Sequence, residues 1–167
     1  MTSSTLVLPK SEPDRRRVLF AGMAFAAMAR PSSAAEPPRA YDIIVHRNIG
    51  CSCCGLWTQA LARSSRFRPH IVDEAAMDAV KRRLGAPAAL QSCHTAEVAG
   101  FLIEGHVPPA DILRLLAERP AGIRGLAVPG MPIGAPGMER TGAAREGFDV
   151  FAFRGDGSHR VFASHPR

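Results

Sequence analysis

The stretch that decides the fold is Tyr41-Asp42-Ile43-Ile44-Val45-His46-Arg47-Asn48-Ile49-Gly50-Cys51-Ser52-Cys53-Cys54-Gly55-Leu56-Trp57. Residues 41–46 are rich in apolar and β-branched side chains and run into the turn-like residues 48–50, which predicts a buried strand. After the cysteines, apolar residues recur at helical spacing at Leu56, Trp57, Ala60 and Leu61. The cysteine cluster is therefore expected in the loop and first turn of a helix that follows a strand.

The next segments repeat this order. Residues 67–72 predict a second strand, and Met77, Val80 and Leu84 form the apolar stripe of a second helix. Asp73 is expected to cap this helix and Gly85 to end it. The run Lys81-Arg82-Arg83 is expected to be a solvated helix end that compensates the helix dipole. Strand and helix in alternation predict an α/β layer.

The second half of the chain predicts further strands and one helix. We expect an extended stretch at 88–95 that carries Cys93, and a strand at 98–103. A helix opened by residues 105–109 should bury Ile112, Leu115 and Leu116 and end at Pro120. The Gly- and Pro-rich residues 126–139 predict irregular structure, and residues 148–153 and 160–163 predict a terminal hairpin. The predicted fold class is α/β, with a central mixed sheet flanked by helices and a C-terminal hairpin.

Length and charge restrict the class of protein. The 167 residues suffice for one domain of ordinary size, expected at 36–167. The formal net charge is +6, but five of the 21 basic and two of the 15 acidic residues lie in residues 1–35, so the remainder carries only +3. Because those remaining basic residues are scattered, we do not expect a nucleic-acid partner.

Residues 1–35 have the pattern of an export signal. Arg15-Arg16-Arg17 precedes an apolar run at 18–29, and the small residues 32–35 offer a cleavage site. The run is too short to span a bilayer about 30 Å thick, and its paired arginines are typical of a twin-arginine signal. An Arg-rich Sec signal and an uncleaved anchor are the alternatives. We expect a periplasmic mature protein that begins near Glu36 and has no membrane span after cleavage.

All four cysteines of the chain lie in two places, Cys51, Cys53 and Cys54 in the first motif and Cys93 in the second. A helix N-terminus favours thiolate, the form that attacks disulfides and binds metals. Soft thiolates favour Cu(I), Zn or an iron–sulfur cluster, and zinc would be satisfied by four cysteines or by three with His94. A thiol–disulfide oxidoreductase with Cys51 as nucleophile and Cys54 as resolving thiol, and a pair of structural disulfides, are the other interpretations.

Four motifs occur in a fixed order: C-x-C-C-G-x-W at 51–57, S-C-H-T-A at 92–96, E-G-H-V-P at 104–108 and G-L-A-V-P-G-M-P-x-G-x-P-G-M-E at 125–139. Together they resemble the CxCC family of periplasmic copper-resistance proteins of the CopG type, over roughly residues 41–153. The resemblance implies a thioredoxin-like fold in which Cys51, Cys53, Cys54 and Cys93 bind Cu(I), as a multinuclear cluster. Ser52 stands where glycine is common in relatives, and we expect little effect because serine there is not a ligand.

Four further residues are candidate ligands. His94 follows Cys93 directly, and neighbours on a strand point to opposite faces, so both can face one metal only if a bulge or loop intervenes. His106 is expected to cap a helix or to contact a ligand rather than the metal. Met131 and Met138 lie in the Gly- and Pro-rich loop and carry thioethers that suit Cu(I), with plain packing as the alternative. Trp57 is expected to pack in the core beneath the site.

These expectations combine into one hypothesis of function. The protein is expected to be a metal-binding protein in copper resistance or homeostasis, whose partners are copper ions and periplasmic copper-efflux or copper-chaperone proteins. Any enzymatic activity would be Cu(I)/Cu(II) redox chemistry or thiol–disulfide exchange. A periplasmic thiol–disulfide oxidoreductase is the first alternative, and a zinc-binding structural module is the second.

Overall fold

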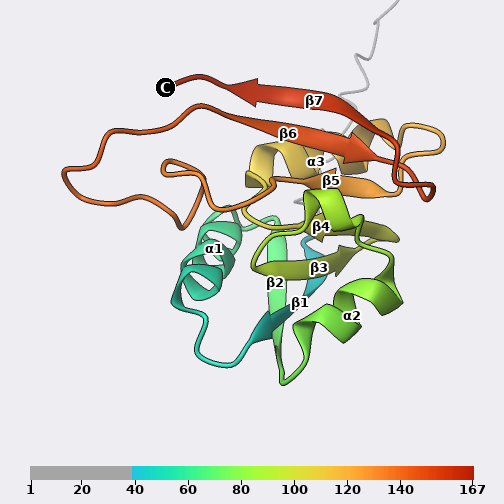
Figure 1. The fold of residues 1–167 in the computed structure, drawn as a ribbon, viewed down its shortest axis with the longest axis horizontal. Helices are drawn as coiled ribbons and strands as arrows, with labels where there is room; N and C mark the ends of the chain where they lie inside the picture. The colour runs from blue at the N-terminus through green and yellow to red at the C-terminus, as the bar shows by residue number, and fades with distance from the viewer. Residues whose placement is uncertain (1–38) are drawn as a thin grey trace, which may run out of the picture. The chain divides into compact units, whose positions relative to one another are not determined.

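The computed structural model describes residues 39–167, and the predicted signal at 1–35 lies outside them. The chain begins with strand β1 (Tyr41–Asn48), helix α1 (Ser52–Arg63) and strand β2 (Phe67–Glu74). β1 and β2 pair in parallel along their whole length. The cysteine cluster therefore opens a helix that directly follows a strand, as the sequence predicts (Figure 1).

The remaining elements complete one mixed sheet. They are α2 (Met77–Leu84), the short 3₁₀ helix η1 (Ala88–Leu90), β3 (His94–Val98), β4 (Phe101–Glu104), α3 (Pro109–Glu118), β5 (Gly125–Ala127), β6 (Phe148–Phe153) and β7 (His159–His165). The seven strands lie in the order β2-β1-β3-β4-β5-β6-β7. Among these strands of residues 39–167, only β1 with β2 and β4 with β5 pair in parallel. The predicted mixed α/β class and the C-terminal hairpin of β6 and β7 are confirmed.

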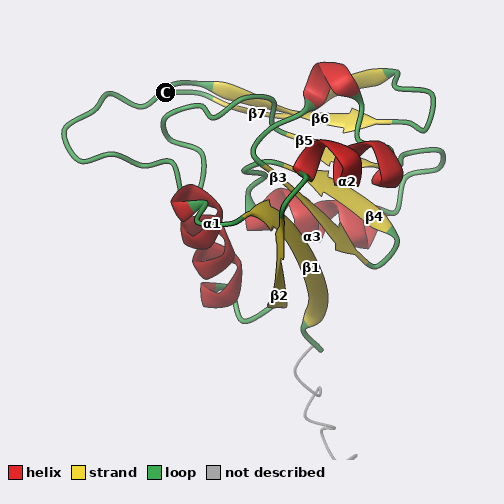
Figure 2. Ribbon diagram, turned by 60° about the horizontal axis from the view of Figure 1, so that its bottom comes forward, coloured by secondary structure: helices red, strands yellow, loops and turns green. Residues whose placement is uncertain are grey.

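Helices cover both faces of the sheet (Figure 2). On one face, Trp57 of α1 and Ile112 of α3 pack with sheet residues such as Ile103 in the main core. On the other face, Leu90 of η1 packs with Leu102 in a smaller cluster. Leu102 and Ile103 are neighbours in β4, so the pleat sends them to opposite faces. Each such fully buried side chain contributes roughly 1.5–3 kcal/mol to folding.

The strand predicted at 98–103 is confirmed only at 101–103, within β4, because a tight hairpin separates these residues from Val98 at the end of β3. Val98 pairs with Phe101 across a two-residue turn, in which Ala99 has φ 46° and Gly100 has φ 88°. Two positive φ values are typical of the turn that joins antiparallel strands most tightly. The extended stretch predicted at 88–95 is also wrong over much of its length, since residues 88–90 form η1 and β3 begins only at His94.

A third correction concerns the start of the loop predicted at 126–139. Residues 125–127 form β5, which pairs in parallel with β4. Gly125 permits this pairing, since a Cβ built there would lie 1.9 Å from the Leu102 carbonyl oxygen. The apolar Leu126 then occupies the core with no exposed surface. The strand was missed because Gly and Pro dominate the residues that follow it.

The predictions for two charged residues near α2, Asp73 as its cap and Lys81 as a solvated side chain, are wrong. Asp73 lies within β2 and accepts a hydrogen bond from Arg47 at 2.9 Å, so it does not cap α2, whose N-cap position is Ala76. Lys81 is 3% exposed and bonds to Glu104, so it is not part of a solvated helix end. By contrast, Gly85 ends α2 in the left-handed conformation, as predicted.

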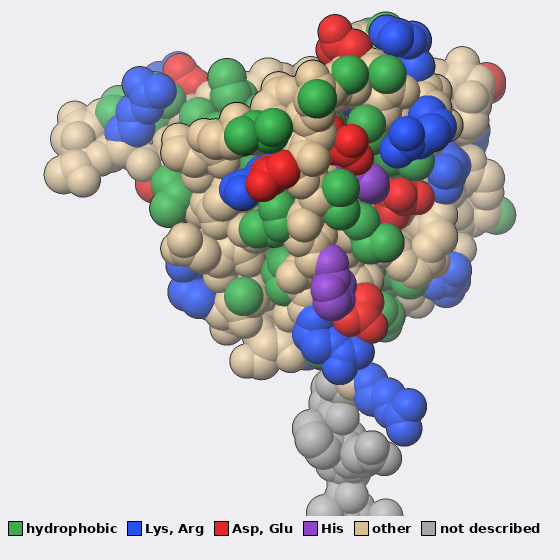
Figure 3. All heavy atoms as spheres, turned by 90° about the horizontal axis from the view of Figure 1, so that it is seen from below, with side chains coloured by type: hydrophobic (Ala, Val, Ile, Leu, Met, Phe, Trp, Pro, Cys, Tyr) green, Lys and Arg blue, Asp and Glu red, His purple; other side chains and the backbone are tan. Residues whose placement is uncertain are grey.

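The surface has no single basic face in the view of Figure 3, where acidic and basic side chains are interspersed with apolar ones. Among residues 39–167, no helix combines the length and apolar character needed to cross a membrane.

Candidate metal centre

The first part of the centre is the N-terminus of α1. Cys51 is the residue before the helix, and Cys53 and Cys54 lie in its first turn, which contains no acidic side chain. Cys54 is fully buried, whereas Cys51 and Cys53 are partly exposed. The positive end of the helix dipole here favours an anionic sulfur. The parallel β1-α1-β2 unit fixes where this turn lies, at one end of the strands.

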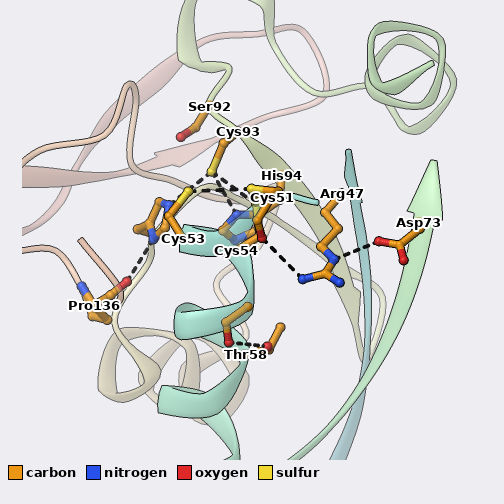
Figure 4. The surroundings of a disulfide bond; sticks show 12 residues. Arg47, Cys51, Cys53, Cys54, Thr58, Asp73, Ser92, Cys93, His94 and Pro136 are labelled. Atoms are coloured by element: carbon orange, nitrogen blue, oxygen red, sulfur yellow. Dashed lines mark hydrogen bonds and ion pairs between the residues drawn. A yellow bond between two sulfur atoms is a disulfide. The ribbon is translucent and has the colours of Figure 1, made fainter. Parts of the chain in front are cut away.

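The four predicted cysteines come together at this point, with their ligand atoms within 4.8 Å of one another (Figure 4). Cys51 and Cys54 form a disulfide across a Cα separation of 5.4 Å. Cys53 and Cys93 are free thiols. The Cys53 sulfur lies 3.6 Å from that of Cys51, and the Cys93 sulfur lies 3.7 Å from that of Cys54. A disulfide between the paired cysteines must be reduced by two electrons before both sulfurs can bind a metal.

Cys93 and His94 face the same side because Cys93 precedes the strand. β3 begins at His94, so the alternation of strand side chains does not apply to the residue before it. Nδ1 of His94 lies 3.1 Å from the Cys93 sulfur, and its ring packs against Trp57 at a tilt of 42°, with centroids 4.3 Å apart. The Trp57 indole N–H donates to the Val107 carbonyl at 2.9 Å. Trp57 is thus core packing under the site, as predicted.

His106 lies closer to the sulfurs than the sequence led us to expect. It does not cap α3, whose N-cap position is Pro108. Its Nδ1 lies 2.8 Å from the Pro136 carbonyl, which can only accept, so Nδ1 carries the proton and Nε2 keeps its lone pair. Nε2 lies 3.1 Å from the Cys93 sulfur. A backbone partner on one imidazole nitrogen is the arrangement that prepares the other nitrogen for a metal.

Both imidazoles are held in the neutral form. Burial lowers the pKa of His94 well below its ordinary value, and the neighbouring ionisable groups His106 and Lys81 act in the same direction. Burial also lowers the pKa of His106, against the opposing effects of the Pro136 carbonyl and Glu139. Nε2 of His94 is buried without a hydrogen-bond partner among the residues that the structure describes. Neutral imidazole is the form of histidine that binds metals.

The Cys93 thiol is in its protonated form here. Burial raises the pKa of Cys93 to about 12, with a further contribution from the neighbouring Cys53, while Ser92 and Lys81 lower it. A metal that binds this sulfur must therefore displace a proton, and its affinity will depend on pH.

The Gly- and Pro-rich loop closes against the first turn of α1. A Cβ on Gly137 would lie 2.6 Å from the Trp57 backbone nitrogen, so only glycine fits at this approach. Met138 is 8% exposed and lines, with Cys53, a hollow of about 220 Å³. Met131 is 53% exposed and does not line it. Of the two candidate methionines, only Met138 lines this hollow together with a cysteine of the site.

A buried ion pair behind Cys93 was missed by the sequence analysis. Lys81 donates to the Glu104 carboxylate, and the Thr95 hydroxyl donates to the same carboxylate at 2.6 Å. Burial raises the pKa of Glu104, and Lys81 opposes that shift. The amphipathic pattern of α2 predicts that Lys81 is exposed to solvent with its basic neighbours. In the sequence, the acidic residue of E-G-H-V-P was the sole indication of a basic partner buried with it.

The remaining histidines lie away from the sulfurs, and three of them bond to carboxylates. His46 bonds to Glu74, His70 to Asp42 and His165 to Asp111. His159 contacts the Gly157 carbonyl near the tip of the terminal hairpin. Within the described residues, the donors that converge are thus four sulfurs and two neutral imidazoles, a set that suits soft metals such as Cu(I) and also zinc.

Comparisons with known proteins find relatives that share this region. Residues 90–138 match the family model described as "Protein of unknown function, DUF411". Two solved structures titled copper resistance protein CopG are each 42% identical to this chain. Form 2 covers 77% of this chain and 100% of its own, with a TM-score of 0.70. Form 1 covers 79% and 100%, with a TM-score of 0.69. A comparison with curated proteins finds no match.

Proposed function

Because this chain belongs to the family of CopG copper resistance proteins, we propose that it binds Cu(I) through Cys51, Cys53, Cys54 and Cys93. The observation that carries the proposal is the convergence of these four sulfurs within 4.8 Å. Cu(I) is a soft ion that prefers thiolate ligands. Four sulfurs this close together can be shared between ions, which supports a multinuclear cluster rather than a single copper.

The surrounding residues support this assignment. His94 and His106 each present a neutral imidazole to the Cys93 sulfur at 3.1 Å, so both are further candidate ligands. Met138 lines the same hollow as Cys53, so its thioether is a further candidate ligand. Trp57, buried beneath His94, keeps water from one side of the site. Burial of this kind controls solvent access and hence the redox potential of a bound metal.

The proposal extends to fold family and location. A C-x-x-C pair at the start of a helix in a parallel strand–helix–strand unit supports a thioredoxin-like scaffold. The Cys51–Cys54 disulfide supports an oxidising compartment such as the periplasm. The export signal at 1–35 and a role in copper resistance beside an efflux or chaperone partner belong to the same proposal. Cell fractionation with N-terminal sequencing tests the first part, with a periplasmic protein that begins near Glu36 as the expected result.

Copper binding is tested by anaerobic reconstitution. The protein is reduced, loaded with Cu(I), desalted and analysed for metal, and more than one copper per chain is expected. The Cys93→Ser variant should lose copper, and so should wild-type protein loaded without prior reduction, because its disulfide withholds two of the four sulfurs. A matched control is Ser52→Ala, which changes a residue of the same turn that is no ligand type. Failure of the reduced wild type to bind copper would refute the proposal, and stoichiometric zinc would favour the structural module.

A second function is supported by the disulfide itself. A substrate thiolate would attack the partly exposed Cys51 sulfur and release Cys54 as a thiol. The second substrate thiol would then attack the mixed disulfide and release Cys51, so that substrate is oxidised and protein reduced by two electrons. Rapid exchange with glutathione or insulin disulfides, together with no tight copper binding, would favour this oxidoreductase function over copper binding.

A further inference from the structure

The segment that carries Cys93 is held by the E-G-H motif on the neighbouring strand. In the antiparallel register of β3 and β4, Thr95 lies opposite Glu104. Continuing that register places His94 opposite Gly105 and Cys93 opposite His106. Three consecutive residues of one motif therefore face three consecutive residues of the other.

Two hydrogen bonds continue this pairing beyond the end of the strands. The Gly105 N–H donates to the His94 carbonyl at 2.9 Å, which extends the ladder by one bond beyond β3. The N–H of Ser92, two residues before His94, donates instead to the Glu104 carboxylate at 2.7 Å. The Glu104 side chain thus accepts the hydrogen bond that a backbone carbonyl of a neighbouring strand would otherwise accept from Ser92. Cys93, between these two bonds, is outside the strand and turns its sulfur toward Cys54 at 3.7 Å.

Glu104 is itself fixed from several sides. It is fully buried, and its oxygens accept from Ser92, Thr95 and Lys81. Lys81 reaches it from α2 and is the cation that compensates its charge in the interior. A carboxylate with three donors and little freedom is a rigid anchor, because moving it would leave buried groups unpaired.

Gly105 allows β4 to approach Ser92 closely. A Cβ there would lie 2.6 Å from Cβ and Oγ of Ser92, and its φ of 71° disfavours any other residue. The Ser92 hydroxyl also donates to the Gly130 carbonyl. Ser92, the residue before Cys93, is therefore hydrogen-bonded both to Glu104 and to the Gly- and Pro-rich loop.

We propose that Glu104 is a positioning residue of the sulfur centre, which holds the Ser92 N–H so that Cys93 stands over the C-x-C-C turn. Glu104 touches no sulfur and binds no copper. Lys81 serves to keep the carboxylate in the interior, and its own contact with the turn is indirect. The inference deepens the proposed copper-binding function and rests on it only for the copper measurement below.

The test compares two double variants that differ in one hydrogen-bond acceptor. Lys81→Met with Glu104→Gln removes both charges but keeps a carbonyl oxygen for Ser92. Lys81→Met with Glu104→Leu removes the charges and the acceptor together. Replacing both members of a buried ion pair by uncharged groups is commonly tolerated in stability. Asp111→Asn is a control for loss of a buried carboxylate contact elsewhere, because Asp111 pairs with His165.

The first readout needs no copper. In a chain carrying Cys51→Ser and Cys53→Ser, only Cys54 and Cys93 remain, and oxidised glutathione converts the two thiols into one disulfide with release of two reduced glutathiones. The equilibrium constant reports how well Cys93 is held beside Cys54. We expect the Gln-containing variant and Asp111→Asn to match the parent within about threefold, and the Leu-containing variant to fall by about 10-fold or more, the range for supporting contacts at metal sites. Equal constants for the two double variants would overturn the proposal.

The second readout is the Cu(I) affinity of the four-cysteine protein, measured by competition with a chromophoric chelator. The Leu-containing variant should again lose about 10-fold or more, and this loss should vanish for the copper that a Cys93→Ser background still binds if Glu104 acts through Cys93. The same loss in that background would contradict the proposal. If the wild type binds no copper, the proposed function fails while the glutathione equilibrium still decides the role of Glu104. Should the Leu-containing variant not fold, hydrogen exchange of the wild-type Ser92 amide decides, because exchange as fast as in an open loop would refute the bond.

Discussion

Replacing Gly137 by alanine tests whether the loop that closes on α1 holds the site together. Gly137 has φ 83°, and an added Cβ would lie 2.6 Å from the Trp57 nitrogen and 3.0 Å from the Cys53 carbonyl oxygen. These are backbone atoms of the first turns of α1, so they cannot swing aside as a flexible side chain would. Either the loop moves outward or the helix start is distorted.

The magnitude can be worked out from a control in the same loop. Gly142 has φ 78°, but an added Cβ meets nothing within 4 Å in the described part of the chain. Gly142→Ala should therefore lose only the cost of a left-handed backbone, about 1–2 kcal/mol of the free energy of unfolding. Gly137→Ala adds a steric clash of the kind that costs about 1–3 kcal/mol in packed interiors. Its total of about 2–5 kcal/mol is a large part of the stability of a domain this size.

Urea unfolding of both variants, followed by tryptophan fluorescence, measures the difference. Trp57 is the chain's only tryptophan and lies at the clash, so its emission reports on this region. Because Pro136 and Met138 flank Gly137, displacement of the loop should also weaken the Cu(I) affinity, whereas Gly142→Ala should leave it unchanged. Equal loss of stability in the two variants, with wild-type copper affinity in both, would refute the close approach of loop and helix.

Three further predictions follow from the site. A thiol titration in denaturant should count two thiols per chain before reduction, from Cys53 and Cys93, and four after it; four without reduction would contradict the disulfide. Burial lowers the pKa of His94 and His106 in the folded state, whereas in the unfolded chain they bind protons below about pH 6.5, so stability should fall as pH drops below that value, by up to about 1.4 kcal/mol per pH unit per histidine. A His106→Gln variant should show a shallower pH slope in chemical unfolding, and an unchanged slope would refute the buried neutral form. Trp57→Phe removes the bond to the Val107 carbonyl and should lower the free energy of unfolding by about 1–3 kcal/mol in urea, while a loss near zero would show that water replaces the indole.

Local patterns predicted the elements whose contacts are local. The apolar run of β1, the stripe of α2 and its Gly85 stop are decided by residues a few positions apart, and the structure contains them as expected. The hairpin between β3 and β4 was misread because Ala99 and Gly100 continue an apolar run while their backbone turns. Hydrophobicity alone does not distinguish a strand from the turn that ends it.

The residues of the site also fall into those that the sequence predicted and those that it did not. The four cysteines were assigned from their clustering and from the family resemblance, and the structure brings their sulfurs together. Asp73 and Lys81 were misassigned because each has a partner on another element, Arg47 in one case and Glu104 in the other. A charged side chain on a helix is solvated unless a distant residue pairs with it, and a single sequence does not reveal that partner.

The motifs S-C-H and E-G-H are separate in the sequence, but in the fold they pair with each other and form one structural unit. The register of β3 and β4 sets them face to face, and Glu104, Gly105 and His106 contact Ser92, His94 and Cys93 in turn. Residues that share contacts in this way do not act independently, so the effects of substituting them should not add. This coupling also explains how the protein holds the Cys93 sulfur just before the start of an inner strand of its sheet. The position of Cys93 depends on a strand, an ion pair and a glycine that bind no metal themselves, and its chemistry depends on that position.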